Sequence, residues 1–159
     1  MDKCRYFAKK GNKITHYYIS GHCSNIIYTD DNDRFDRVDV LLTGNTGTRA
    51  VMEIKYRRKP SYKSYDYEGH ILEWDKFTAM TQTQYSEYKH LYEMIYGDYI
   101  LMWDVAYVTE DMFVIDEKRK FPKTTMGDSD EEGPKKVAYL NSKDCCTIIK
   151  RVPGDETYN

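Results

Sequence analysis

The chain has 159 residues, the length of one domain, and 24 basic and 26 acidic side chains give it a net charge of −2. Aromatic residues make up 14% of the chain, 16 of them tyrosine, and this content excludes an intrinsically disordered protein. The near-zero charge excludes a protein that coats nucleic acid through bulk positive charge, but it does not exclude a local basic patch.

Localisation follows from the apolar runs and the cysteines. No apolar run approaches the ~18 residues that a membrane-spanning helix requires, and the start of the chain has no apolar segment of the signal-peptide kind. The four cysteines include no C-x-x-C pair, which favours reduced thiols. We therefore expect a single domain over residues 1–159 that is cytoplasmic and has no membrane partner.

The first third of the chain predicts a β-hairpin. Short aromatic and β-branched runs in residues 5–29 indicate irregular structure with one or two short strands, and no helix is evident in residues 1–35. Residues 37–42 and 49–56 are predicted strands. The Gly- and Asn-containing segment between them is typical of a tight turn.

A long helix and several strands are predicted next. Residues 57–70 are polar and carry Pro60, which indicates a loop. Apolar residues between 71 and 96 recur at spacings of three and four, and this predicts one helix that ends at Gly97. Further strands are predicted at residues 99–103, 105–108, 112–115, 137–140 and 147–149, with a mobile acidic loop at 121–136. The succession predicts an α/β (α+β) fold.

Two carboxylates and a lysine in the hairpin form the most informative chemical pattern. Glu53 and Lys55 lie two apart on a strand, so their side chains share one face. The hairpin turn could bring Asp39 of the partner strand close to Glu53. Carboxylate oxygens suit Mg²⁺ or Mn²⁺, and an ammonium suits the charge that develops on a phosphate. The pattern predicts metal-dependent hydrolysis of phosphodiesters.

The acid-x-Lys triplet alone is a weak signal, because it occurs three times in the chain. Glu87 and Asp116 begin the other two triplets. Only Glu53 follows both an apolar run and a hairpin strand that carries an acid. The plain alternative is a structural or assembly protein in which Glu53 and Lys55 form a surface ion pair.

In this context the chain resembles a known family. Asp39, a spacer of thirteen residues and then Glu53-Ile54-Lys55 is similar to the motif of the PD-(D/E)XK nuclease superfamily, and the resemblance covers about residues 36–108. Gln84 and Tyr88 resemble the Q-x-x-x-Y motif of its RecB-like branch. Small bacteriophage and gut-bacterial members show a similar succession, here Glu53-Ile54-Lys55-Tyr56-Arg57, then Leu72, Glu73 and Lys76, then Trp103.

The resemblance implies a fold and a metal site. The fold is a restriction-endonuclease-like core, in which a mixed central sheet carries a β-hairpin followed by a long helix. Asp39 and Glu53 would hold Mg²⁺ or Mn²⁺ together with the backbone carbonyl of Ile54, and Lys55 would be the catalytic lysine. Asp36 rivals Asp39 for the metal. The acidic N-terminal helix of the family is not evident in this sequence.

Further site residues come from the helix and the basic loop. Gln84 and Tyr88, four apart on the predicted helix, would face the site and position DNA. Glu73 could reach the metal, although an acid in a first turn also suits the helix dipole. Phosphate contacts are expected in the acid-free segment 55–63, from Arg57, Arg58, Lys59 and Lys63, with neighbouring tyrosines stacking on bases. The alternative is a solvated flexible loop.

Two functional hypotheses follow. The first is a Mg²⁺- or Mn²⁺-dependent endonuclease or exonuclease that acts on nucleic acid, DNA rather than RNA, and that could form a homodimer to cut two strands. The second is a catalytically idle, phage-encoded protein with a nuclease fold, which binds or regulates host nucleic acid or a host defence complex. Either protein would act in the cytoplasm, that of the host if a phage encodes it.

Overall fold

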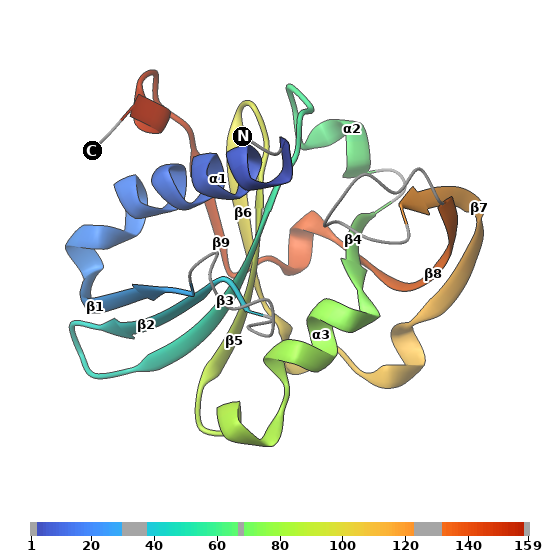
Figure 1. Ribbon diagram of the computed structural model, residues 1–159, viewed down its shortest axis with the longest axis horizontal. Helices are drawn as coiled ribbons and strands as arrows, with labels where there is room; N and C mark the ends of the chain where they lie inside the picture. Colours follow the sequence, from blue (N-terminus) through green and yellow to red (C-terminus); the bar gives the residue numbers. More distant parts are fainter. Residues whose placement is uncertain (1–2, 30–37, 67–68, 123–131, 158–159) are drawn as a thin grey trace.

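The computed structural model describes residues 3–29, 38–66, 69–122 and 132–157, and these form an α+β fold with two sheets (Figure 1). In this part of the chain, the mixed sheet has the order β1-β2-β3-β5-β6-β9, and a smaller sheet has the order β4-β8-β7. The strands of the mixed sheet are β1 (Cys23–Tyr28), β2 (Val40–Gly44), β3 (Arg49–Tyr56), β5 (Lys89–Ile95), β6 (Tyr99–Asp104) and β9 (Thr147–Lys150). Those of the smaller sheet are β4 (His70–Glu73), β7 (Val114–Pro122) and β8 (Glu132–Leu140).

The chain begins with helix α1 (Lys3–Ile19), so the prediction that residues 5–19 are irregular is wrong. The helix packs on the sheet through Ile14, which is fully buried against Ile95 and Ile100. Gly11 lies close to the sheet, because a Cβ there would be 3.2 Å from Ile54 Cγ2. Between residues 9 and 19, whose side chains are described, the buried positions are Gly11, Ile14 and Thr15. Only one of these is a large apolar residue, so this part of the helix has a weak amphipathic pattern.

The predicted hairpin is confirmed. Strands β2 and β3 pair antiparallel, with Val40 opposite Met52 and Thr43 opposite Arg49. The turn between them includes Gly47 at φ 90°, a conformation that glycine adopts without strain. Strand β1, which lies in the region where short strands were predicted, pairs antiparallel with β2 and completes a three-stranded meander.

The long helix predicted over residues 71–96 is wrong. That segment forms strand β4, the short helix α3 (Trp74–Met80), a 3₁₀ turn at Thr83–Tyr85 and strand β5, which runs parallel to β3. Strand β5 is buried on both faces, and the periodicity of a short apolar run does not separate such a strand from a buried helix. The predicted loop at 57–70 contains the one-turn helix α2 (Lys63–Asp66).

The last third of the chain follows the prediction in part. The strands predicted at 99–103, 137–140 and 147–149 are confirmed as parts of β6, β8 and β9. Residues 105–107 form a 3₁₀ turn instead of a strand, because the Asp104 side chain accepts a hydrogen bond from the Ala106 N–H and caps the turn. The predicted loop at 121–136 is shortened by β7 and β8, which pair as a hairpin; residues 123–131 lie outside the described residues.

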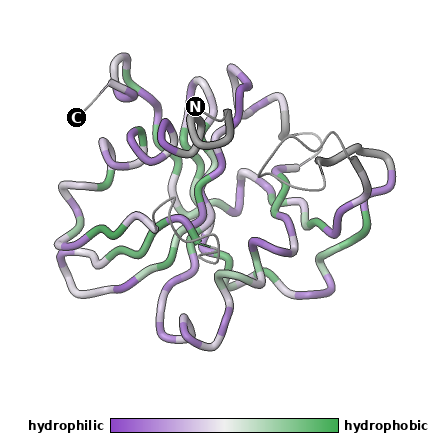
Figure 2. The backbone as a smooth tube through the Cα atoms, in the orientation of Figure 1, coloured by the Kyte–Doolittle hydropathy of each residue, from purple (hydrophilic) through white to green (hydrophobic). Residues whose placement is uncertain are grey.

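Three apolar clusters form the core of the described residues, and in Figure 2 hydrophobic stretches lie along the strands. On one face of the mixed sheet, β5 and β6 contribute Tyr92 and Trp103 to a core that includes Leu72 of β4 and Met80 of α3. Helix α1 covers the opposite face. Among the described residues, no helix is long and apolar enough to span a membrane.

Candidate active site

The structure brings Asp39 and Glu53 together at the edge where β2 begins. Glu53 lies on β3 and is 2% exposed. Asp39 directly precedes β2; its backbone N–H donates to Met52 O (3.1 Å), and its carboxylate accepts from the Ile54 N–H (2.8 Å). These two bonds hold Asp39 beside Glu53, and the two carboxyl groups interact directly.

The carboxyl pair is poorly solvated. Burial raises the pKa of Glu53 to about 8, with a further contribution from the charge of Asp39. Burial also raises the pKa of Asp39. Glu53 Oε2 is buried and lacks a hydrogen-bond partner in the described part of the chain. Two adjacent carboxylates with an unsatisfied oxygen form a place where a cation is electrostatically favoured.

Lys76 supplies the positive charge closest to this pair. Its Nζ, on α3, lies 2.5 Å from Glu53 Oε1. Burial lowers the pKa of Lys76, but the neighbouring Glu53 outweighs that effect and leaves the pKa raised. Lys76 was noted in the sequence only as part of the resemblance and was not predicted as a site residue. Its spacing of three from Glu73 at a helix start was the available signal.

Lys55 lies on the same face of β3 as Glu53 and contacts Glu73. Lys55 Nζ is 3.7 Å from Glu73 Oε1, and Lys135 Nζ of β8 is 3.1 Å from Glu73 Oε2. Burial lowers the pKa of Lys55 despite Glu73. Burial would raise the pKa of Glu73, but the charges of Lys55 and Lys135 together bring this pKa below its usual value. Glu73 therefore pairs with lysines. Lys135 comes from the second sheet and was not predicted as a site residue.

Gln84 and Tyr88 do not reach the carboxyl pair, because the helix that would have aimed them is absent. Gln84 is exposed in the 3₁₀ turn. Arg49 lies over the Tyr88 ring, with its Cζ 4.5 Å from the ring centroid. Arg49 begins β3, and the four residues from there to Glu53 span about 13 Å of strand. The predicted active-site role of Gln84 and Tyr88 thus loses its geometric basis.

The structure also bears on the other ligands that were predicted. The N–H and C=O of one strand residue point to the same edge, so the Ile54 carbonyl faces the edge at which Asp39 lies. Asp36 lies outside the described residues. In the segments that the structure describes, no group of three or more His, Cys, Asp or Glu side chains could hold a metal ion. A cation here would rely on Asp39, Glu53, the backbone and water.

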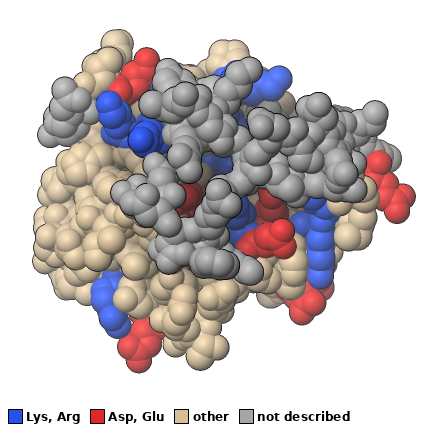
Figure 3. Space-filling model, viewed as in Figure 1, with Lys and Arg blue, Asp and Glu red and all other residues tan. Residues whose placement is uncertain are grey.

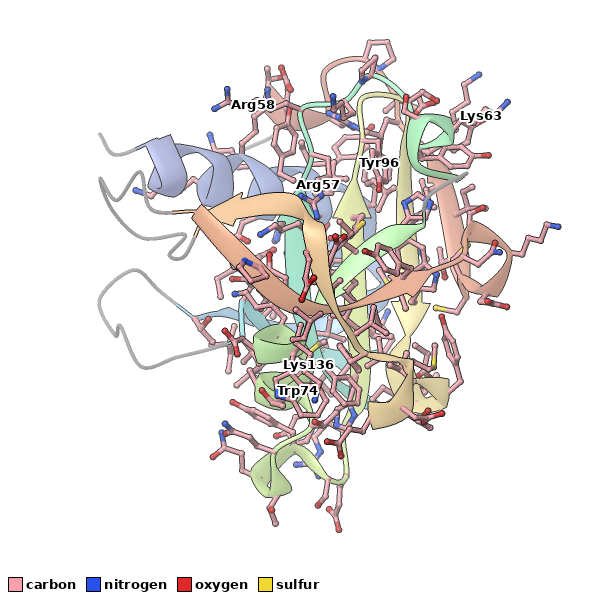
Figure 4. The ribbon with its side chains drawn as sticks, turned by 90° about the vertical axis from the view of Figure 1, so that its right-hand side faces the viewer. Arg57, Arg58, Lys63, Trp74, Tyr96 and Lys136 are labelled. Atoms are coloured by element: carbon pink, nitrogen blue, oxygen red, sulfur yellow. The ribbon has the colours of Figure 1, made fainter. Side chains whose placement is uncertain are left out.

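The basic segment 57–63 is anchored to the neighbouring turn rather than free. The Arg57 N–H donates to Ile95 O (2.8 Å), and Lys59 O accepts from the Gly97 N–H (2.9 Å). Tyr62 packs edge-on against Tyr99, with ring centroids 5.3 Å apart. Figure 4 labels Arg57, Arg58 and Lys63 of this segment, which lie toward the end of β3 in the upper part of the view.

The four cations of that segment differ in position. The positive charge of Arg57 contributes to lowering the pKa of Lys55, so Arg57 lies next to the site. Arg58, Lys59 and Lys63 are exposed and lie farther along the chain. Figure 3 shows acidic and basic side chains side by side on the right-hand part of the face in view. Of the predicted phosphate contacts, Arg57 is thus the one beside Lys55.

Among the cysteines whose side chains are described, Cys23, Cys145 and Cys146 are free thiols. We compared the chain with known proteins to find a relative that shares these residues. No family model matches the chain, and neither does any curated protein or solved structure.

Proposed function

We propose that this protein is a Mg²⁺- or Mn²⁺-dependent phosphodiesterase that acts on nucleic acid, DNA rather than RNA. One observation carries the proposal: the buried carboxyl group of Glu53 lies beside the partly buried carboxyl group of Asp39, and Glu53 Oε2 has no partner among the described residues. Lys55 shares the face of Glu53 and has a pKa lowered by burial. Two hard oxygen ligands beside a lysine are the groups that metal-assisted phosphodiester hydrolysis requires.

The order of the elements supports a restriction-endonuclease-like core. Helix α1 leads into the meander β1-β2-β3, and the chain then crosses through α3 to β5, which is parallel to β3. In this proposal helix α1 would correspond to the N-terminal helix of the family, although residues 3–19 contain no acid. Helix α3 is seven residues long, shorter than the long helix that the resemblance implies.

Each side chain has a role in this proposal. Asp39 and Glu53 would hold the cation with the Ile54 carbonyl. When bound, the cation would lower the pKa of a coordinated water and neutralise charge on a phosphate oxygen. Lys55 would donate to the scissile phosphate or hold the attacking water, and Arg57 would contact a neighbouring phosphate. Glu73 would keep Lys55 in place through their 3.7 Å ion pair.

A cleavage assay with matched variants tests the proposal. Supercoiled plasmid and linear duplex are incubated with the protein in Mg²⁺, in Mn²⁺ or in EDTA. We expect cleavage with either metal, none with EDTA, and loss of cleavage in Glu53→Gln. Glu87→Gln is the matched control, because Glu87 begins another acid-x-Lys triplet but is exposed. Metal-dependent cleavage that persists in Glu53→Gln would overturn the assignment of the site.

A second candidate function is a nuclease-fold protein that binds nucleic acid or a defence complex without cutting. The 2.5 Å contact between Lys76 and Glu53 favours it, because a lysine then neutralises the carboxylate that a metal would need. Calorimetric titration with Mn²⁺ separates the two functions. Binding at millimolar metal supports the enzyme, whereas absence of binding in both the wild type and Lys76→Met supports the non-enzymatic protein.

A further inference from the structure

A pocket of about 260 Å³ lies directly beside the candidate active site. It is formed between the first residues of α3 and the start of β8, and its lining consists of Glu73, Trp74, Asp75, Gly133, Pro134, Lys135 and Lys136. Its volume is below the roughly 300–1,000 Å³ of pockets for drug-sized ligands. The pocket therefore suits one small planar group with a charged attachment.

Trp74 provides a rigid aromatic surface in this pocket. Its ring is held by Phe77 and Phe113, with centroids 5.8 Å and 4.9 Å away. The Lys136 ammonium lies over the Trp74 ring, 3.9 Å from its centroid (Figure 4). Among the described residues, Lys136 also forms a 3.7 Å pair with the exposed Glu110, a kind of pair that contributes little. Lys136 can therefore move aside and expose the ring at little cost.

The pocket is joined to the catalytic lysine through Glu73. Glu73 lines the pocket, pairs with Lys55 through one carboxylate oxygen and pairs with Lys135 through the other. A group that enters the pocket is therefore separated from Lys55 by one side chain. Lys135 and Lys136 of β8 both line the pocket, and their ammonium groups can face the phosphates on either side of a bound nucleoside.

We propose that this pocket holds one unpaired base of the nucleic-acid substrate, stacked on Trp74, with Lys135 and Lys136 facing the adjacent phosphates. The proposal rests on the proposed function and names its substrate class: single strands, or duplexes with a frayed, flapped or branched end. Stacking on an aromatic ring accepts any base, so the pocket selects for an unpaired base and not for a sequence. A base inside a duplex has both faces stacked and cannot enter unless it is flipped out.

Intrinsic fluorescence tests the pocket directly. The chain has two tryptophans, and Trp103 is fully buried in the core. In EDTA, which prevents metal-dependent cleavage, the wild type is titrated with a single-stranded thymidine oligonucleotide, a duplex of equal length and polyglutamate. We expect quenching by the single strand, little by the duplex and none by polyglutamate. Trp74→Phe should abolish the quenching.

Affinities from the anisotropy of labelled oligonucleotides complete the test. Trp74→Ala should weaken single-strand binding by about tenfold, and Lys136→Ala, which removes no core packing, should weaken it by about threefold. Both variants should bind duplex as the wild type does. The matched control is Lys143→Ala, an exposed lysine outside the pocket. Unchanged single-strand affinity in Lys136→Ala together with a folded Trp74→Ala that also binds normally would overturn the proposal.

Failure of the pocket and failure of the nuclease are distinguishable. Quenching by single strands without metal-dependent cleavage would support the base-binding pocket and contradict the nuclease proposal. Cleavage without quenching, or equal quenching by single strand and duplex, would support the nuclease proposal and contradict the base-binding pocket. Quenching by polyglutamate equal to that by the oligonucleotide would also remove it, since the ligand would then be an acidic peptide.

Discussion

Lys76 Nζ lies 2.5 Å from Glu53 Oε1, so an ammonium from helix α3 occupies the position next to a buried carboxylate where a divalent cation would bind. Glu53 Oε2 meanwhile has no hydrogen-bond partner among the described residues. Under the proposed function, a cation and Lys76 would compete for one carboxylate. Lys76 would then determine metal affinity as well as pair with Glu53.

Replacing Lys76 should strengthen metal binding. Lys76→Met keeps the length of the side chain and removes the charge, so we expect the affinity for Mn²⁺ to rise by about tenfold, a modest part of the Coulomb energy of a buried pair. Isothermal titration calorimetry measures this affinity. Lys63→Met, in which an exposed lysine is replaced, should leave it unchanged. Weaker Mn²⁺ binding in Lys76→Met would show that Lys76 supports the metal site instead of competing with the cation.

Glu93 should make the protein less stable as the pH rises. It is buried on β5, and Thr15 of α1 donates to its carboxyl group at 2.5 Å. Burial raises its pKa from 4.5 to about 7. The folded protein therefore binds the Glu93 proton more tightly than the unfolded chain does. This contribution to the free energy of unfolding is fully present below pH 4.5 and is lost as the pH rises through 7, by about 3 kcal/mol in all.

The matching variant is Glu93→Gln, which keeps an oxygen acceptor for Thr15 and does not ionise. We expect urea unfolding of the wild type to show a fall in unfolding free energy from pH 5 to pH 8, and Glu93→Gln to show a clearly smaller fall. Glu53, whose pKa is also raised, should account for part of the remaining slope. If the wild type and Glu93→Gln had the same pH dependence, the folded chain would not hold Glu93 protonated.

Asp155 should stabilise the contact between the C-terminal segment and α1. It is 2% exposed and accepts hydrogen bonds from Arg151 Nε (2.8 Å), Arg151 Nη2 (2.8 Å) and the Tyr18 hydroxyl (2.8 Å). Removing one partner of a buried, hydrogen-bonded pair leaves the other uncompensated, so Asp155→Ala should cost about 3 kcal/mol in urea unfolding. Glu156→Ala, at a more exposed acid, should cost less than about 1 kcal/mol. Equal costs for the two variants would show that the Asp155 contacts are not formed in solution.

Gly97 should be intolerant of a side chain because it fixes the basic segment. A Cβ at Gly97 would lie 2.8 Å from Pro60 O and 2.9 Å from Pro60 Cα. Gly97→Ala must therefore push residues 57–63 away from the sheet, which we expect to cost about 2 kcal/mol and to weaken DNA binding. Gly21→Ala is the control, since nothing lies within 4 Å of the Cβ it would add. The DNA affinity and the urea midpoint of unfolding are measured for both variants. If Gly97→Ala had the same affinity and midpoint as Gly21→Ala, the anchored geometry of residues 57–63 would be contradicted.

Local signals explain which parts of the fold could be predicted. The hairpin of β2 and β3 is specified by two apolar runs around a Gly- and Asn-containing turn, and its antiparallel pairing brings Asp39 to Glu53. Strand β5 could not be recognised by periodicity, because it is buried on both faces and its sequence shows no alternation of apolar and polar residues. Helix α1 was not recognised because, among its residues 9–19, only Ile14 is a large buried apolar side chain.

Within the candidate site too, the residues that are close in sequence could be predicted and those brought together by packing could not. Asp39, Glu53 and Lys55 belong to one hairpin, so the sequence alone could group them. The contacts of Lys76 and Lys135 depend on how α3 and the second sheet pack against β3, so the spacing of Lys76 from Glu73 could mark a helix start but not the contact with Glu53. Gln84 and Tyr88 were grouped by a helical spacing that the 3₁₀ turn does not provide.

The measurement that tests the central claim most directly is the Mg²⁺-dependent rate of DNA cleavage by Lys55→Ala and its matched control Lys89→Ala. Both lysines end an acid-x-Lys triplet, but only Lys55 lies beside the buried carboxyl pair. We predict that wild-type protein cleaves DNA, that Lys89→Ala cleaves at the same rate, and that Lys55→Ala is slower by at least about a hundredfold. Cleavage by Lys55→Ala at the wild-type rate, or no cleavage by folded wild type in Mg²⁺ or Mn²⁺, would contradict the account.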